Sequence, residues 1–173
     1  AGLVDELTGL GNRRFLINAL DGREASVRQA GADPEDSARA NFLLVQIDDF
    51  AAINERLGSA AGNAVLRQIA ALLKERSPPG SILVRLEGAT FLLHLSSSDD
   101  AMAREFARRV ADAVVATTFD DGAGQQVRCS CCVGVAGLPF VADNPAMSGW
   151  ELALSAANGA LRLARRGGSS SVL

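Results

Sequence analysis

The chain of 173 residues carries 17 basic and 20 acidic side chains, for a formal net charge of −3, and 48% of it is hydrophobic. This composition fits one soluble domain with a sizeable core, and its slight acidity excludes a general attraction to nucleic acid or to an anionic membrane. No apolar run approaches the ~20 residues that cross a bilayer, and the charged and apolar pattern of a signal peptide is not expected at residue 1. We expect one cytoplasmic domain over residues 1–173, excised from a longer multidomain protein.

The N-terminal part predicts a helix, a loop and a buried strand. Asn12 can cap a helix that starts near Arg13, and the apolar stripe of this helix fades by Gly31. Gly31–Arg39 is polar and contains glycine and proline, which indicates a loop. Phe42–Ile47 is an apolar run of strand length, typical of a central strand that is buried on both faces.

The middle of the chain predicts two helices followed by a hairpin. Phe50–Leu57 reads as a short helix and Ala60–Lys74 as a longer amphipathic one. Two strands are then expected at Ile82–Leu86 and Thr90–Leu95, and Glu87–Ala89 forms the turn between them.

The C-terminal part predicts a helix, a strand and a last helix. Ser96–Asp99 caps a helix that runs to about Val115. A turn at Gly122–Gln126 leads into a strand over Val127–Val135. The last helix is expected at Trp150–Arg166.

The order of these elements mixes crossover helices with a hairpin. It predicts an α/β fold of the α+β type, with a mixed central sheet of about five strands that is flanked by helices. The fifth strand is expected to begin at Val172, beyond a loop at Leu138–Ser148 and the last helix.

Three cysteines cluster at Cys129, Cys131 and Cys132. Their spacing matches no zinc pattern, and His94 is the one histidine of the chain, so no metal site is expected. We interpret the cysteines as small apolar residues of a buried strand in a reducing compartment. His94 stands between leucines in a strand pattern and is expected to be structural.

Four stretches of the chain resemble, in order and spacing, the signature motifs of the GGDEF, or diguanylate cyclase, family. They are Asp5–Phe15 (DELTGLGNRRF), Ile47–Asn63 (IDDFAAINERLGSAAGN), Arg85–Leu95 (RLEGATFLLHL) and Ala157–Gly168 (ANGALRLARRGG). The family has DxLTGLxNRR, DxDxFKxINDxxGHxxGD, RxGGDEFxxLL and ADxALYxAKxxGRN in these places. The resemblance covers nearly the whole chain, and it implies a sheet like that of nucleotide cyclase and polymerase palms.

The resemblance also implies a chemistry whose metal ligands are replaced here. In the family, carboxylates hold two divalent cations that help one GTP attack the α-phosphate of another, with one half-site on each subunit of a dimer. Such hard cations need anionic oxygen ligands. The two principal ligand positions fall on Gln46 and Ala89. Asp48 is retained, at a position that is usually structural in the family. We therefore expect neither a bound metal nor another cofactor.

The motif that gives the family its name reads EGATF over Glu87, Gly88, Ala89, Thr90 and Phe91. Its acidic pair falls on Ala89 and Thr90, neither of which carries charge. Glu87 stands at the first glycine of the motif, where a carboxylate would repel a triphosphate. Gly88 is retained and favours a tight turn.

The resemblance leaves a vestigial nucleotide pocket at Asn54, Asn63 and Arg165. The guanine-reading asparagine survives as Asn54, but its partner aspartate falls on Asn63, which adds no charge. The phosphate-contacting lysine falls on Arg165 and the arginine four residues later on Ser169. Arg162 replaces a tyrosine that usually packs in the core. Alternatively, the asparagines hydrogen-bond nearby turns, and the arginines form a solvated face that complements the helix dipole.

The product-inhibition site of the family, an RxxD motif, falls on Pro78 and Ser81. Neither residue can make the bidentate contact of an arginine with guanine. Feedback binding of cyclic di-GMP at this place is therefore not expected.

The leading interpretation is a catalytically inactive GGDEF domain in bacterial cyclic di-GMP signalling. The resemblance implies a regulatory, dimerisation or docking role, beside an EAL domain, as in composite GGDEF–EAL proteins of the FimX and LapD types. Homodimers or a protein partner are expected, without nucleic acid or membrane insertion. A second hypothesis is a GTP-binding allosteric module without cyclase activity, based on Asn54, Gly88 and Arg165. A remote third is an active cyclase.

Overall fold

The computed structural model describes residues 2–29, 39–138 and 149–168. Nearly all of the loops predicted at Gly31–Arg39 and Leu138–Ser148, together with Ser169 and the strand predicted from Val172, lie outside these ranges. The helices are α1 (Arg13–Gln29), α2 (Phe50–Leu57), α3 (Ser59–Arg76), α4 (Asp100–Ala116) and α5 (Gly149–Arg166). The strands are β1 (Ala40–Ile47), β2 (Ile82–Glu87), β3 (Thr90–Leu95), β4 (Phe119–Asp120), β5 (Gln126–Val127) and β6 (Cys131–Leu138).

The main sheet has four strands in the order β2-β3-β1-β6 within the described residues. Every pair of neighbours is antiparallel, so the α+β class is confirmed but the mixed sheet of about five strands is not what the described chain forms. The reason is the position of the crossovers. The crossover from β1 to β2 through α2 and α3 passes over β3, and the crossover from β3 to β6 through α4 passes over β1. In each case the strand between the two runs in the opposite direction, as in a split β-α-β unit.

The strand predicted over Val127–Val135 is divided in two. β5 pairs with β4 in a small separate sheet, and β6 begins only at Cys131. The amide side chain of Gln68 on α3 accepts a hydrogen bond from the backbone N–H of Asp120 (2.9 Å) and donates to its carbonyl (2.6 Å). These bonds hold β4, and with it β5, against α3 instead of along β1.

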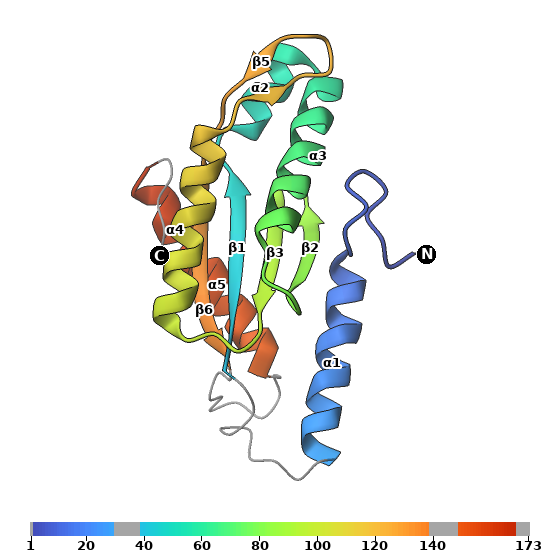
Figure 1. Cartoon of the computed structure of the whole chain (residues 1–173), viewed down its shortest axis with the longest axis vertical. Helices are drawn as coiled ribbons and strands as arrows, with labels where there is room; N and C mark the ends of the chain where they lie inside the picture. Colours follow the sequence, from blue (N-terminus) through green and yellow to red (C-terminus); the bar gives the residue numbers. More distant parts are fainter. Residues whose placement is uncertain (1, 30–38, 139–148, 169–173) are drawn as a thin grey trace.

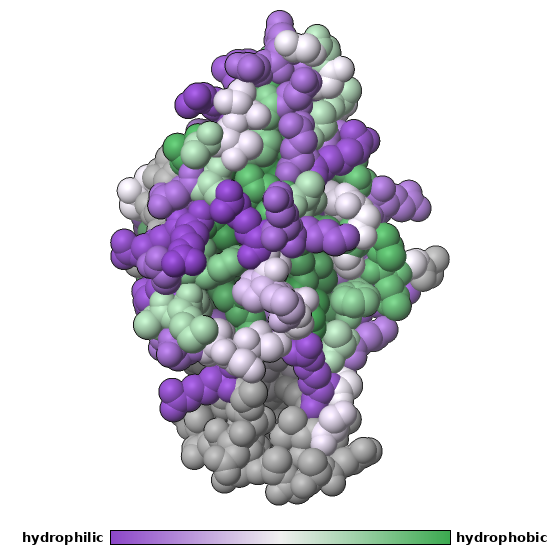
Figure 2. Space-filling view, in the orientation of Figure 1, coloured by the Kyte–Doolittle hydropathy of each residue, from purple (hydrophilic) through white to green (hydrophobic). Residues whose placement is uncertain are grey.

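Helices cover both faces of the main sheet. α3 and α4 lie in front of it and α5 behind it in Figure 1, and α1 shares the second face with α5 through the cluster that contains Leu16, Leu20 and Trp150. Figure 2 shows the face of α3 and α4, where hydrophobic surface gathers in the middle, between hydrophilic helix flanks. No described helix has the length and apolarity that crossing a membrane requires.

β1 is buried on both faces, as its apolar sequence predicts. Leu43 and Val45 pack under α3 and α4, whereas Phe42 and Leu44 pack under α1 and α5. The alternation follows from the period of two residues in a strand. β1 therefore joins the two halves of the core.

The predicted helix caps at the first and fourth helices are confirmed. The side chain of Asn12 accepts a hydrogen bond from the backbone N–H of Phe15 at 3.0 Å. Asp99 does the same for Met102 at 2.8 Å. Such bonds satisfy backbone donors that a helix leaves free in its first turn.

His94 on β3 is structural, as expected. Its side chain is 4% exposed and lies edge-on to Phe42, with ring centroids 5.7 Å apart. Burial, followed by the nearby charge of Arg23, lowers the pKa of His94 to about 4. The Nη1 atom of Arg23 lies 3.3 Å from Nδ1 of His94, so the neutral imidazole can accept its hydrogen bond.

Gly134 lets α5 approach the sheet. A Cβ atom at this position of β6 would lie 2.4 Å from the carbonyl oxygen of Ala157 and 2.5 Å from the backbone nitrogen of Leu161. Both are backbone atoms, so only movement of the whole helix would relieve the contact.

We expect Gly134→Ala to lower the free energy of unfolding by about 2–3 kcal/mol, because the added methyl group meets helix backbone. Gly159→Ala is the matched control, since a Cβ atom there meets nothing within 4 Å, and it should raise stability by about 0.5–1 kcal/mol as a helix-interior glycine is removed. Urea denaturation of both variants checks this. Equal stabilities would contradict the close packing of α5.

Candidate functional site

The turn between β2 and β3 occupies the place of the EGATF motif. Gly88 adopts the left-handed conformation, with φ of 54°, which a glycine tolerates best. Glu87 and Gly88 are exposed, whereas Ala89 is half-buried and packs against the core. The carbonyl of Ala89 accepts a hydrogen bond of 3.1 Å from the backbone N–H of Ile47. The turn is therefore tight, and it is attached to the end of β1.

Gln46 and Thr90, from two separate motifs, are brought together. They are direct partners in the antiparallel pairing of β1 with β3. The Nε2 atom of Gln46 donates a hydrogen bond of 3.2 Å to Oγ1 of Thr90. Phe91, the next residue, is fully buried in the core. Two neutral polar groups thus bond to each other where β1 and β3 meet the turn.

Asp48 follows β1 and is engaged by hydroxyl and thiol groups. Its Oδ2 atom accepts a hydrogen bond from Ser130 at 2.6 Å, and its Oδ1 atom accepts one from the thiol of Cys132 at 3.2 Å. Asp49 is exposed and has a positive φ of 50°. Within the described ranges, no three carboxylate, histidine or cysteine side chains gather as a metal site would require.

The cysteines lie at the start of β6 and just before it. Cys131 and Cys132 are buried and Cys129 is half-buried. Burial and the charge of Asp48 raise the pKa of Cys129 to about 11 and that of Cys131 still further. These thiols stay protonated at neutral pH, as the expectation of small apolar core residues requires.

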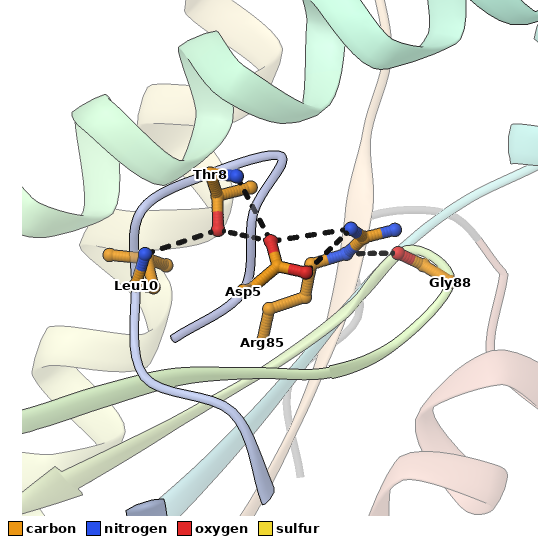
Figure 3. Close-up of polar contacts among 5 residues, drawn as sticks. All are labelled: Asp5, Thr8, Leu10, Arg85 and Gly88. Carbon is orange, nitrogen blue, oxygen red and sulfur yellow. Dashed lines mark hydrogen bonds and ion pairs between the residues drawn. The ribbon is translucent and has the colours of Figure 1, made fainter. Parts of the chain in front are cut away.

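The loop before α1 is fastened to the hairpin turn by an ion pair (Figure 3). Nη1 of Arg85 lies 3.1 Å from Oδ1 of Asp5, and these side chains are 17% and 20% exposed. Nε of Arg85 also donates to the carbonyl of Gly88 at 2.9 Å. Thr8 donates to Asp5 through both its backbone N–H and its hydroxyl, at 3.0 and 2.6 Å. The guanidinium group of Arg85 therefore links the loop before α1, which we call the entry loop, to the hairpin turn.

This network determines the charge state of Asp5. Burial alone would raise the pKa of this carboxyl group, but the hydrogen bonds from Thr8 and the charge of Arg85 outweigh burial. The pKa of Asp5 is consequently held below its ordinary value of 3.8. The sequence pattern did not indicate the partner of Asp5, which lies eighty positions along the chain.

The two asparagines of the vestigial pocket lie on α2 and α3. Oδ1 of Asn54 is buried and has no hydrogen-bond partner, and it packs so close to Gly62 that a Cβ atom there would overlap it. Asn63, the next residue after Gly62, is exposed. Asn54 thus keeps one unsatisfied acceptor.

Arg165 lies elsewhere, in an open hollow between α1 and α5 that also contains Gln46 and Arg162. Its described lining includes neither Asn54 nor Asn63. Arg162 and Arg165 are both exposed, in agreement with the expected basic face of the last helix. At the other end of β2, Pro78 and Ser81 form a turn, with a 3.2 Å hydrogen bond from the N–H of Ser81 to the carbonyl of Pro78.

Comparison with known proteins gives a consistent match. The family model "Diguanylate cyclase, GGDEF domain" matches residues 2–171. Diguanylate cyclase TpbB of Pseudomonas aeruginosa is 34% identical over 150 residues, which cover 82% of this chain and 31% of that protein. The chain therefore spans about a third of the length of this curated relative.

Two solved structures share the fold. The GGDEF domain of FimX from Pseudomonas aeruginosa superposes with a TM-score of 0.82 at 21% identity, covering 99% of both chains. Diguanylate cyclase SiaD of Pseudomonas aeruginosa, solved in complex with its activator SiaC, gives a TM-score of 0.83 at 24% identity, covering 100% of this chain and 62% of that one.

We expect Asp5→Asn to lower the free energy of unfolding at pH 7 by about 1–2 kcal/mol, because a charged partner of Arg85 is lost. A carboxyl group with a depressed pKa stabilises the fold above its unfolded value, and this contribution disappears as the pH falls through the folded value. The difference in the free energy of unfolding between the wild type and Asp5→Asn should therefore shrink below pH 3.8.

Urea denaturation at neutral and acid pH measures this difference. Glu105→Gln is the control, because its pair with Arg109 is exposed on α4 and should contribute at most about 0.5 kcal/mol. If the difference in the free energy of unfolding between the wild type and Asp5→Asn stays constant down to pH 2, the proposed contribution of the ion pair to stability is wrong.

Proposed function

Because the chain belongs to the diguanylate cyclase (GGDEF) family, we propose that it is a catalytically inactive member that serves cyclic di-GMP signalling as a regulatory, dimerisation or docking module. The observation that carries this proposal is the bond between Gln46 and Thr90. Gln46 stands where the family resemblance puts a metal-binding carboxylate, and its neutral side chain bonds to the neutral hydroxyl of the neighbouring Thr90.

The chemistry of the reaction explains why this replacement matters. Divalent cations bridge the triphosphate and neutralise charge that develops during phosphoryl transfer, and carboxylates hold them there. Gln46 offers one neutral carbonyl oxygen, and Ala89 offers no side-chain oxygen at all. Asp48 already accepts hydrogen bonds on both carboxylate oxygens. The side-chain oxygens that remain at Gln46 and Asp48 are therefore a poor ligand set for two divalent cations.

A regulatory role is supported by what the chain keeps. The loop before α1, the hairpin turn and the capped helices are all in place, and the ion pair between Asp5 and Arg85 holds the turn in its shape. Diguanylate cyclase SiaD, part of which shares this fold, was solved in complex with its activator SiaC. We include in the proposal a neighbouring EAL domain in the same chain and a cytoplasmic location.

A second candidate is a GTP-binding allosteric module. The buried Oδ1 atom of Asn54, which lacks a hydrogen-bond partner, favours it. Without metal ions beside the triphosphate, we expect weak binding. Calorimetry with GTP and Mg²⁺ separates the candidates, since a dissociation constant in the low micromolar range would favour the allosteric module.

We expect the purified chain to form no cyclic di-GMP from GTP and Mg²⁺, with TpbB as the positive control. The double variant Gln46→Asp/Ala89→Glu should regain part of the metal or nucleotide binding, because it restores two anionic ligands. Chromatography of the products and calorimetry of the variant measure both results. Accumulation of cyclic di-GMP by the wild-type chain would refute the proposed inactivity.

A further inference from the structure

A groove of about 610 Å³ runs between α1 and α5 on the second face of the sheet. We call it the α1–α5 groove, and its principal lining residues are Arg13, Trp150, Leu154, Leu161, Arg162 and Arg165. It shares Gln46, Arg162 and Arg165 with the candidate site and extends beyond that site along α5 to Trp150.

The groove has two different ends. At one end, the indole N–H of Trp150 donates a 3.1 Å hydrogen bond to Asp21, which ties α5 to α1. At the other end, Arg13, Arg162 and Arg165 are all exposed. Between the ends, Leu154 is half-buried and Leu161 is buried. The base of the groove is thus apolar, its exposed middle also carries the polar Ser155 and Asn158, and its open end is positively charged.

The dimensions of the groove suit a helix. Its lining residues recur along α5 at helical spacing from Trp150 to Arg165, so they form one continuous stripe. At ~1.5 Å per residue, this stripe is about 22 Å long, the length of a four-turn helix. A phosphate ion, in contrast, would fill only the arginine end.

The charge of the open end is opposite to that of the chain as a whole, whose formal net charge is −3. Arg14 and Arg166, both exposed, flank the three lining arginines. Glu151, the acidic residue among the described lining, stands at the closed end beside Trp150. The positive charges are therefore concentrated at the open end.

Two of these arginines are unfavourably placed for their own helix. Arg13 and Arg14 occupy the first turn of α1, which contains no acidic residue. A positive charge there opposes the helix dipole at a cost of about 0.3–1 kcal/mol. Complementing the dipole of α5 explains Arg165 and Arg166, but it does not explain this pair. A negatively charged partner would offset the cost.

We propose that the α1–α5 groove docks an amphipathic helix of a partner protein, with acidic residues of that helix against Arg13, Arg162 and Arg165. Its apolar side lies on Trp150, Leu154 and Leu161, and its carboxylates form charge-assisted pairs at the open end. This inference rests on the docking role proposed above, and names the surface and the chemistry of the partner.

Trp150 makes the docking measurable without a label. It is the one tryptophan of the chain, which has no tyrosine, so its emission reports on the closed end of the groove. The probe is a synthetic 18-residue helix of leucine and glutamate, without aromatic residues. A peptide with lysine in place of glutamate is the matched control. We expect the acidic helix to shift the emission of Trp150, and the basic one to leave it unchanged.

Three variants separate charge, shape and location. Arg162→Glu/Arg165→Glu should weaken binding of the acidic helix by about tenfold or more. Ser155→Phe, an exposed position in the groove, should block binding sterically without changing charge. Arg104→Glu/Arg108→Glu, on the exposed side of α4 across the sheet, should bind like the wild type. Circular dichroism verifies that each variant is folded.

The remaining outcomes distinguish the possible occupants. Inorganic phosphate or GTP alone should not shift the emission of Trp150, because Arg162 lies about 18 Å along α5 from it. Equal binding of both peptides, an equal effect of the α4 variant, or failure of the acidic helix to bind would overturn the docking proposal. Cyclic di-GMP synthesis is assayed on the same preparation. Synthesis without helix binding refutes both proposals, whereas no synthesis and no binding refutes only this one.

Discussion

The burial of β1 between β3 and β6 is the constraint on which the rest of the molecule depends. Its side chains alternate between two cores, so a shift of one residue would exchange Leu43 and Val45 with Phe42 and Leu44. That register puts Gln46 opposite Thr90 on one side and opposite Cys132 on the other. The chemistry at the end of β1 is therefore determined by packing that lies well away from it.

We propose that the site combines a preserved scaffold with altered chemistry. Arg85 links Asp5 of the entry loop to the carbonyl of Gly88, and this link holds the turn without any contribution from metal ligands. Gln46 and Thr90 meanwhile satisfy each other as neutral groups. The proposed regulatory role requires that the carboxylates can be absent without loss of the fold, and the residues that hold the turn are not those at the two ligand positions.

The two faces of the sheet differ in what they offer a partner. α3 and α4 present hydrophilic flanks around a hydrophobic middle (Figure 2). α1 and α5 enclose a groove with an apolar floor and an arginine-rich end. Arg162 is central to this difference, since an exposed guanidinium stands where the family resemblance places a core tyrosine. A domain of net negative charge thus carries a positive surface at this groove, which favours an acidic partner there.

The sequence by itself determined the helices, the hairpin, the α+β class and the family, because these follow from local periodicity, caps and motif spacing. It also predicts, through the family resemblance, that Gln46, Ala89 and Thr90 are the altered positions. Tertiary structure alone decided the antiparallel order of the strands, the division of the strand predicted at Val127–Val135, the pairing of Asp5 with Arg85 and the groove beside Trp150. Each of these joins residues far apart in the chain, and contacts of that kind arise from packing that no local pattern encodes.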